Sequence, residues 1–373
     1  MTELKFSLNT LQQIAKERTV KTQNIEYDLE TLVKKIDKNI IKLDPEYQRK
    51  HRWSEEVSSR LIESLILNIP VPTVYLSQDL DVDEEDEDIP RYSVIDGQQR
   101  LTAIYKFMKN DLALVGMDVL SPLNNSYYRD LPPFLSRRLE ERTIKCLRID
   151  STVDTQVKYD IFERLNTGSV RLEAQELRNA IYRGPFNNLI KKLAKDQNFM
   201  RLNQIDLKNP SKNKKVQKME DVELVLRYFA LQDNNDKKMK KGFKQFLSDR
   251  MEELNNSTDE ELAAYEQNFQ MVMKLIIEKF GEEAFAKYKL KSDNSTLIQM
   301  SKFNAAVYDA LSIAIASEIK KGQLEITSEL TEEFRELFKN TDFFESVSGS
   351  VNDKKKVNYR IDAVKELLQH GRY

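Results

Sequence analysis

The stretch VIDGQQRL, residues 94–101, combines residue types that can bind an anion. It is typical of a strand that runs through a one-glycine turn into a helix. Gly97 permits a backbone conformation that other residues avoid, and Asp96 can cap the helix. Three possible donors follow at once: Gln98, Gln99 and Arg100. A helix N-terminus stabilises a phosphate through its N–H groups and dipole, yet a purely structural turn explains the same residues equally well.

A second candidate stretch is DPEYQRKHRW, residues 44–53, where four consecutive residues that can carry positive charge stand between two aromatic residues. Cations next to aromatic rings suit phosphate contacts combined with ring stacking. The alternative is a surface loop that Tyr47 and Trp53 anchor to the core.

The third stretch is FERLNTGSVRL, residues 162–172. Asn166, Thr167 and Gly168 form a turn between two expected helices, and Arg164 precedes that turn. Turn chemistry alone accounts for Asn and Gly at these positions.

In this order the three stretches closely resemble the N-terminal domain family of GmrSD-type modification-dependent restriction enzymes. That family is more distantly similar to the ParB and sulfiredoxin superfamily. The resemblance covers roughly residues 20–235. It implies binding and hydrolysis of a nucleotide, GTP or ATP, possible use of Mg²⁺, and coupling to DNA recognition or cleavage in defence against phage.

The resemblance also implies a place for each matching residue. The phosphate-facing turn would comprise Asp96, Gly97, Gln98, Gln99 and Arg100. A neighbouring wall of the nucleotide pocket would comprise Tyr47, Gln48, Arg49 and Trp53. The downstream stretch would close the pocket with Arg164, Asn166, Thr167 and Gly168. Of these, Arg100 would be a catalytic counter-charge, and Asp96 a magnesium ligand or water-orienting base, although capping the helix would serve Asp96 equally well.

Many relatives in this family carry a C-terminal HNH nuclease domain, which requires a histidine base and metal ligands in one short segment. This chain has only two histidines, His51 and His370. We therefore expect no HNH nuclease, and DNA cleavage would need a partner subunit or an uncharted site.

Hydrophobic periodicity indicates an α+β fold in two parts. We expect a mixed ParB/sulfiredoxin-like domain over 20–185 and a helical domain over 186–373. The first part should contain helices at 28–38, 54–68, 97–110, 152–165 and 171–184, and strands at 73–77, 91–95 and 142–150. The second of these helices should start at the cap Ser54, with the apolar residues Val57, Leu61, Ile62 and Leu65 on one face. From about Met219 onward only helical patterns occur.

Composition excludes several classes of protein. The 373 residues carry a net charge of −2, with 32% charged and 40% hydrophobic residues, which is typical of a globular chain and not of a uniformly basic one. The single cysteine, Cys146, cannot form an intrachain disulfide. The start MTELKFSLNT has no signal-peptide pattern, and AAVYDALSIAIAS is too short to span a membrane and contains Asp309. These patterns predict a cytoplasmic protein that does not associate with membranes.

Two lysine-rich stretches, KNPSKNKKVQK (208–218) and KKMKKGFK (237–244), are candidates for contacts with DNA phosphates. The lysines concerned are Lys212, Lys214, Lys215, Lys218, Lys237, Lys238, Lys240 and Lys241. The alternative is an exposed connection followed by a solvated helix start.

The leading interpretation is a nucleotide-binding, NTP-hydrolysing protein of a prokaryotic defence system. The alternatives are a non-catalytic DNA-binding or regulatory protein and a partner-dependent nuclease subunit. The leading interpretation is compatible with a protein partner from a defence operon and with a homo-oligomer.

Overall fold

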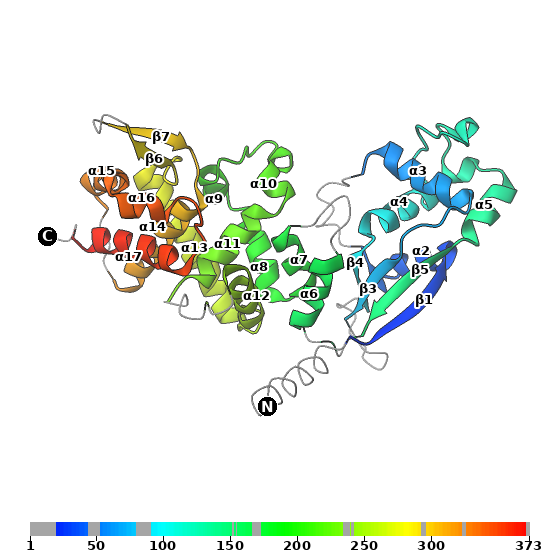
Figure 1. The fold of residues 1–373 in the computed structure, drawn as a ribbon, viewed down its shortest axis with the longest axis horizontal. Helices are drawn as coiled ribbons and strands as arrows, with labels where there is room; N and C mark the ends of the chain where they lie inside the picture. Colours follow the sequence, from blue (N-terminus) through cyan, green and yellow to red (C-terminus); the bar gives the residue numbers. More distant parts are fainter. Residues whose placement is uncertain are drawn as a thin grey trace, which may run out of the picture. The chain divides into compact units, whose positions relative to one another are not determined.

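The computed structural model describes residues 20–43, 53–79, 91–150, 153, 155–165, 173–233, 239, 242–291, 296–322 and 326–370. The chain divides into two compact units, Met1–Arg171 and Leu172–Tyr373, each of which has its own packing (Figure 1). No helix among the described residues is long and apolar enough to cross a membrane.

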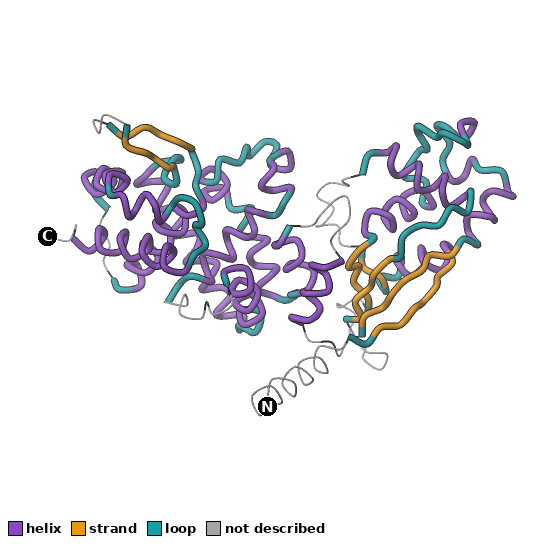
Figure 2. The backbone as a smooth tube through the Cα atoms, in the orientation of Figure 1, coloured by secondary structure: helices purple, strands orange, loops and turns teal. Residues whose placement is uncertain are grey.

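The first unit is built on a five-stranded mixed sheet with the order β1-β5-β3-β4-β2 (Figure 2). Its strands are β1 (Thr22–Asp28), β2 (Ile41–Lys42), β3 (Val74–Gln78), β4 (Tyr92–Asp96) and β5 (Thr143–Ile149). β3 lies between a parallel neighbour, β5, and an antiparallel neighbour, β4. The strands predicted at 73–77, 91–95 and 142–150 are confirmed, whereas β1 and β2 are additional.

Helices pack with this sheet to form one apolar core. They are α2 (Leu29–Asp37), α3 (Glu55–Ile66), α4 (Gln98–Met108) and α5 (Pro133–Glu140), with short 3-10 turns η1 (Ser121–Leu123) and η2 (Tyr128–Asp130). As predicted, α3 starts at the cap Ser54, whose hydroxyl accepts from the N–H of Val57. Leu61, Ile62 and Leu65 are buried, whereas Val57 in the first turn is 43% exposed. α6 (Thr155–Leu165) packs against β4.

The described part of the second unit is almost entirely helical. Its α-helices are α7 (Ala174–Ile181), α8 (Pro185–Leu193), α9 (Gln197–Leu202), α10 (Lys214–Gln217), α11 (Glu220–Ala230), α12 (Phe243–Leu254), α13 (Asp259–Phe280), α14 (Ala305–Lys320), α15 (Ser328–Glu336), α16 (Thr341–Ser346) and α17 (Lys354–His370). Its 3-10 turns are η3 (Pro210–Lys212) and η5 (Leu337–Lys339). The expectation of helices alone after Met219 is wrong, because β6 (Lys287–Leu290) and β7 (Leu297–Ser301) pair as an antiparallel hairpin. Its residues are only partly buried, so no strong alternation of apolar residues marks it in the sequence.

A buried ionic cluster joins three helices of the second unit. Asp309 on α14 is fully buried and accepts from Arg227 on α11 and Arg360 on α17. The distances are 3.0 Å from Arg227 Nε to Oδ1 and 2.6 Å from Arg360 Nη2 to Oδ2. Arg360 also donates to the backbone carbonyls of Ser346 and Val351. A charged residue therefore interrupts the apolar stretch of α14 because it cross-links the helices around it.

We predict that Asp309→Asn destabilises the protein by about 3–5 kcal/mol, because it leaves two buried guanidinium groups without a carboxylate. Urea unfolding followed by circular dichroism measures the loss. The control is Asp233→Asn, which breaks an exposed pair with Lys320 and should cost about 1 kcal/mol or less. Equal stability of the two variants would contradict a structural role for the cluster.

Candidate functional site

The turn between β4 and α4 is closed by Gly97, which is the N-cap of α4 and has a φ of 101°. A residue with a side chain would be strained at this φ, and the space that its Cβ would need is occupied by Val74. A Cβ placed on Gly97 would lie 2.8 Å from Cγ2 of Val74, the first residue of the neighbouring strand β3. Glycine is required here because the helix start packs directly against β3.

Arg100, in the first turn of α4, ties the turn to the start of β3. Its Nη2 donates to Oδ2 of Asp96 at 2.7 Å. Its Nη1 donates to the backbone carbonyl of Pro72 and, at 3.2 Å, to that of Thr73. The side chain is 11% exposed. Arg100 therefore positions the turn, because most of its donors are already used within the domain.

Asp96 does not cap the helix, contrary to one expectation from the sequence. α4 has no side-chain cap, because Gly97 occupies the N-cap position and Asp96 directs its carboxylate to Arg100 four residues later. The Asp96 side chain remains 48% exposed. Only Oδ2 takes part in this pair, so Oδ1 can accept from a further group.

The first turn of α4 holds the two predicted glutamines. Its opening N–H groups have no carboxylate or hydroxyl cap, since the N-cap has no side chain. The side-chain nitrogen of Gln98 is buried and has no hydrogen-bond partner among the described residues. A buried donor without an acceptor costs about 1–3 kcal/mol. An anion placed over this turn would therefore gain an uncapped helix N-terminus and an unused amide donor.

The remaining predicted nucleotide-binding residues are only partly described. Trp53 packs against the core of the first unit, as one of the two alternatives for its stretch expects. Arg164 is exposed in the last turn of α6, the helix that packs against β4. Six predicted residues lie outside the described residues: Tyr47, Gln48, Arg49, Asn166, Thr167 and Gly168.

The lysines of the first basic stretch differ sharply in their surroundings. Lys215 is partly buried, donates from Nζ to the backbone and side-chain oxygens of Asn203 at 3.0 and 2.7 Å, and lies over the ring of Phe303. Burial lowers its pKa to about 8. Lys218 pairs with Glu173 at 2.8 Å. These two lysines anchor their segment within the second unit, and both ammonium groups are engaged by other residues of the chain.

The other lysines of these two stretches are either exposed or undescribed. Lys212 and Lys214 are exposed, and neither side chain has a hydrogen bond or ion pair within the described part of the chain. The four lysines of the second stretch lie outside the described residues: Lys237, Lys238, Lys240 and Lys241. In the described residues, no group of three His, Cys, Asp or Glu side chains could hold a metal ion.

The first unit is therefore an α+β domain that presents an uncapped, glycine-bounded helix N-terminus at the end of a strand. Residues 29–183 match the family model of the GmrSD restriction endonuclease, N-terminal domain. This match covers less than half of the chain and confirms the resemblance inferred from the sequence for these residues. The comparisons with curated proteins and with solved structures gave no match.

We predict that Gly97→Ala destabilises the first unit by about 1–3 kcal/mol, because the new Cβ meets Val74 and the φ of 101° becomes strained. Urea unfolding of the full chain, followed by the fluorescence of Trp53 in that unit, measures the change. The matched control in the same unit is Gly116→Ala, which also has a positive φ but whose Cβ would come no closer than 3.2 Å, to the flexible side chain of Glu56. The smaller loss expected for the control separates the steric effect from the backbone effect. If Gly97→Ala were the milder of the two changes, the close approach to Val74 would have no energetic weight.

Proposed function

We propose that this protein binds a nucleoside triphosphate at the turn between β4 and α4 and hydrolyses it as part of a prokaryotic restriction or anti-phage system. The observation that carries the proposal is the uncapped start of α4 after Gly97, with the unpartnered amide of Gln98, inside a domain of the GmrSD N-terminal family. Nucleotide state would then control recognition of DNA or of a protein partner.

The turn supplies the groups that a phosphate needs. Backbone N–H groups at a helix start donate to phosphate oxygens while the helix dipole favours the negative charge. Gln98 adds a side-chain donor that has no other described partner. Arg100 contributes mainly by holding the turn in place, although its positive charge, shared with Asp96, still faces the same region.

Asp96 fits one further requirement of triphosphate chemistry. Mg²⁺ is usually held by one or two carboxylates together with the phosphates of the substrate. The half-exposed Asp96 has one carboxylate oxygen outside its pair with Arg100, so it would hold the ion or orient the attacking water. The metal would neutralise charge on the phosphates. The chain itself positions that carboxylate through Arg100.

We expect the purified protein to release phosphate from GTP or ATP in the presence of Mg²⁺. Gln98→Ala should weaken nucleotide binding about tenfold or more, because a hydrogen bond to a charged group contributes about 1.5–3 kcal/mol. Asp96→Asn should lower the rate of phosphate release more than it lowers affinity. Calorimetric titration and a phosphate-release assay measure the two effects.

The control is Gln23→Ala, which removes an exposed amide from β1 in the same unit. Thermal unfolding by circular dichroism establishes that each variant folds. Absence of nucleotide binding by the unaltered protein, or unchanged binding and turnover in both site variants, would overturn the proposal.

A second candidate function, DNA binding without catalysis, is favoured by the exposed and unpaired lysines Lys212 and Lys214. Lys215 and Lys218 fix the backbone beside them, so the two free ammonium groups project from an anchored segment. Lysines in this arrangement suit contacts with the DNA backbone and the release of counterions.

The double variant Lys212→Gln/Lys214→Gln should weaken DNA binding and reduce the slope of log K against log salt by about 1.8, which is about 0.9 for each lost phosphate contact. Fluorescence anisotropy with a labelled duplex at several salt concentrations measures the slope. The control is Lys289→Gln/Lys291→Gln, which removes two exposed lysines near the hairpin of the same unit. Salt-independent binding, or the same slope in both double variants, would contradict this function.

A further inference from the structure

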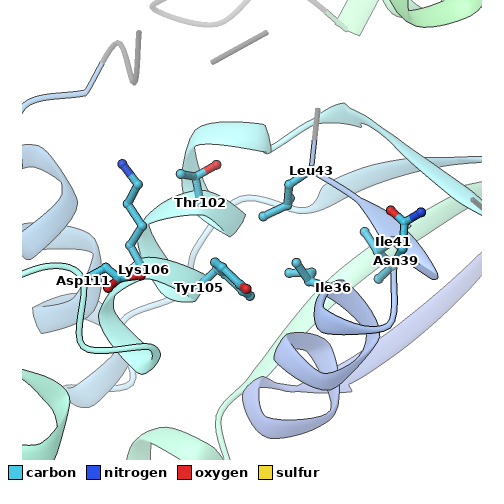
Figure 3. Close-up of a pocket in the computed structure, with 8 residues that line it drawn as sticks. All are labelled: Ile36, Asn39, Ile41, Leu43, Thr102, Tyr105, Lys106 and Asp111. Atoms are coloured by element: carbon cyan, nitrogen blue, oxygen red, sulfur yellow. The ribbon is translucent and has the colours of Figure 1, made fainter. Parts of the chain in front are cut away.

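A pocket of about 290 Å³ opens beside α4 in the first unit (Figure 3). Eight residues from the end of α2, from β2 and its flanks, and from α4 and the residues after it line this pocket: Ile36, Asn39, Ile41, Leu43, Thr102, Tyr105, Lys106 and Asp111. Sites for small ligands typically occupy about 300–1,000 Å³. This pocket is therefore near the lower limit and suits a single ring system with its attached groups.

One side of the pocket is apolar and rigid. Three aliphatic side chains line it: Ile36, Ile41 and Leu43. The ring of Tyr105, on α4, points toward Ile36 (Figure 3), and its hydroxyl donates to Oδ1 of Asp37 at 3.0 Å, which holds the ring in place. A fixed aromatic ring next to aliphatic side chains is a suitable surface for a planar ring.

The opposite side carries an ammonium group that is available to a ligand. The ammonium group of Lys106 has no hydrogen bond or ion pair with any described residue. Lys109, about one turn later, differs because it pairs with Asp37 at 2.6 Å. Figure 3 shows the Lys106 side chain extended toward the Thr102 end of the helix, which is the end nearer to the turn at Gly97.

The pocket and that turn share one face of α4. Gln98, Thr102 and Lys106 are spaced four residues apart, and such positions lie on the same face of a helix. The hydroxyl of Thr102 donates to the backbone carbonyl of Gln98 at 2.8 Å. From Gln98 to Tyr105 the helix rises about 10 Å, a length that a nucleoside triphosphate can span.

We propose that this pocket holds the nucleoside part of the ligand whose phosphates bind at the Gly97 turn, so the inference rests on the proposed function. The base packs between the aliphatic side chains and Tyr105. Lys106 binds the phosphate nearest the sugar, which places a cation between the two ends of the site. Asn39 and Asp111, at the rim, offer an amide and a carboxylate to the polar edge of the base.

Two variants test the pocket separately from the turn. Leu43→Trp fills the space for the base, and Lys106→Met removes the ammonium group but keeps most of the stem. The matched control is Lys145→Met, an exposed lysine on β5 outside the pocket. Calorimetric titrations with GTP, ATP and inorganic tripolyphosphate, each with Mg²⁺, measure affinity, and circular dichroism establishes folding.

The unaltered protein should bind at least one nucleotide about tenfold or more tightly than tripolyphosphate, since stacking of one base contributes about 1–3 kcal/mol. Leu43→Trp should lose this advantage while tripolyphosphate affinity stays within about twofold. Lys106→Met should weaken nucleotide binding about tenfold, as expected for the loss of a charge-assisted contact. Lys145→Met should bind like the unaltered protein.

Two results would overturn the inference, and they differ from each other. Equal affinity of the unaltered protein for nucleotides and tripolyphosphate, or undiminished nucleotide binding by the folded variants, removes the pocket from the site and leaves the proposed function standing. If Leu43→Trp does not fold, undiminished nucleotide binding by Lys106→Met alone removes the pocket from the site. Failure of both nucleotide and tripolyphosphate to bind removes the proposed function and the inference with it.

Discussion

The candidate site depends on the hydrogen bonds made by the guanidinium group of Arg100. This group joins the carboxylate of Asp96 at the end of β4 to the carbonyls of Pro72 and Thr73 just before β3. The same contact region brings Gly97 against Val74, so no side chain other than hydrogen fits at the N-cap. These contacts position the α4 N-terminus, which has no side-chain cap and therefore needs another restraint.

Local signals in the sequence predict much of the first unit. Ser54 and Asp28 mark helix starts correctly because each side chain accepts from a backbone N–H three residues later. β1 and β2 escape prediction for a different reason. β1 pairs with β5, more than a hundred residues away, and β2 is only two residues long, so neither produces a local pattern. The β6–β7 hairpin is missed because its residues are only partly buried.

The sequence indicates candidate residues for the site but does not determine the contacts that each of them makes. Asp96 and Arg100 are four residues apart, which permits a pair across one helical turn, yet the sequence equally permits Asp96 to cap the helix. Lys214 and Lys215 are adjacent and chemically identical, but one is exposed and the other is held by Asn203 and Phe303. The contacts that hold Arg100 and Lys215 come from other segments, namely Pro72 and Thr73 for Arg100, and Asn203 and Phe303 for Lys215. Charge and spacing in one segment therefore identify candidates and leave their function to tertiary contacts.

The same reasoning changes which cation would meet an anionic ligand. The charge of Arg100 is largely compensated by Asp96 at 2.7 Å, and two of its other donors are bound to backbone carbonyls. Moving this side chain to a ligand would cost those hydrogen bonds and release the turn that it fixes. Lys106 has no such commitments and stands on the face of α4 that begins with Gln98. A ligand bound along this face would thus leave the Arg100 contacts intact and would pair with the Lys106 ammonium group. On this helix, Arg100 would then position the turn and Lys106 would bind the ligand.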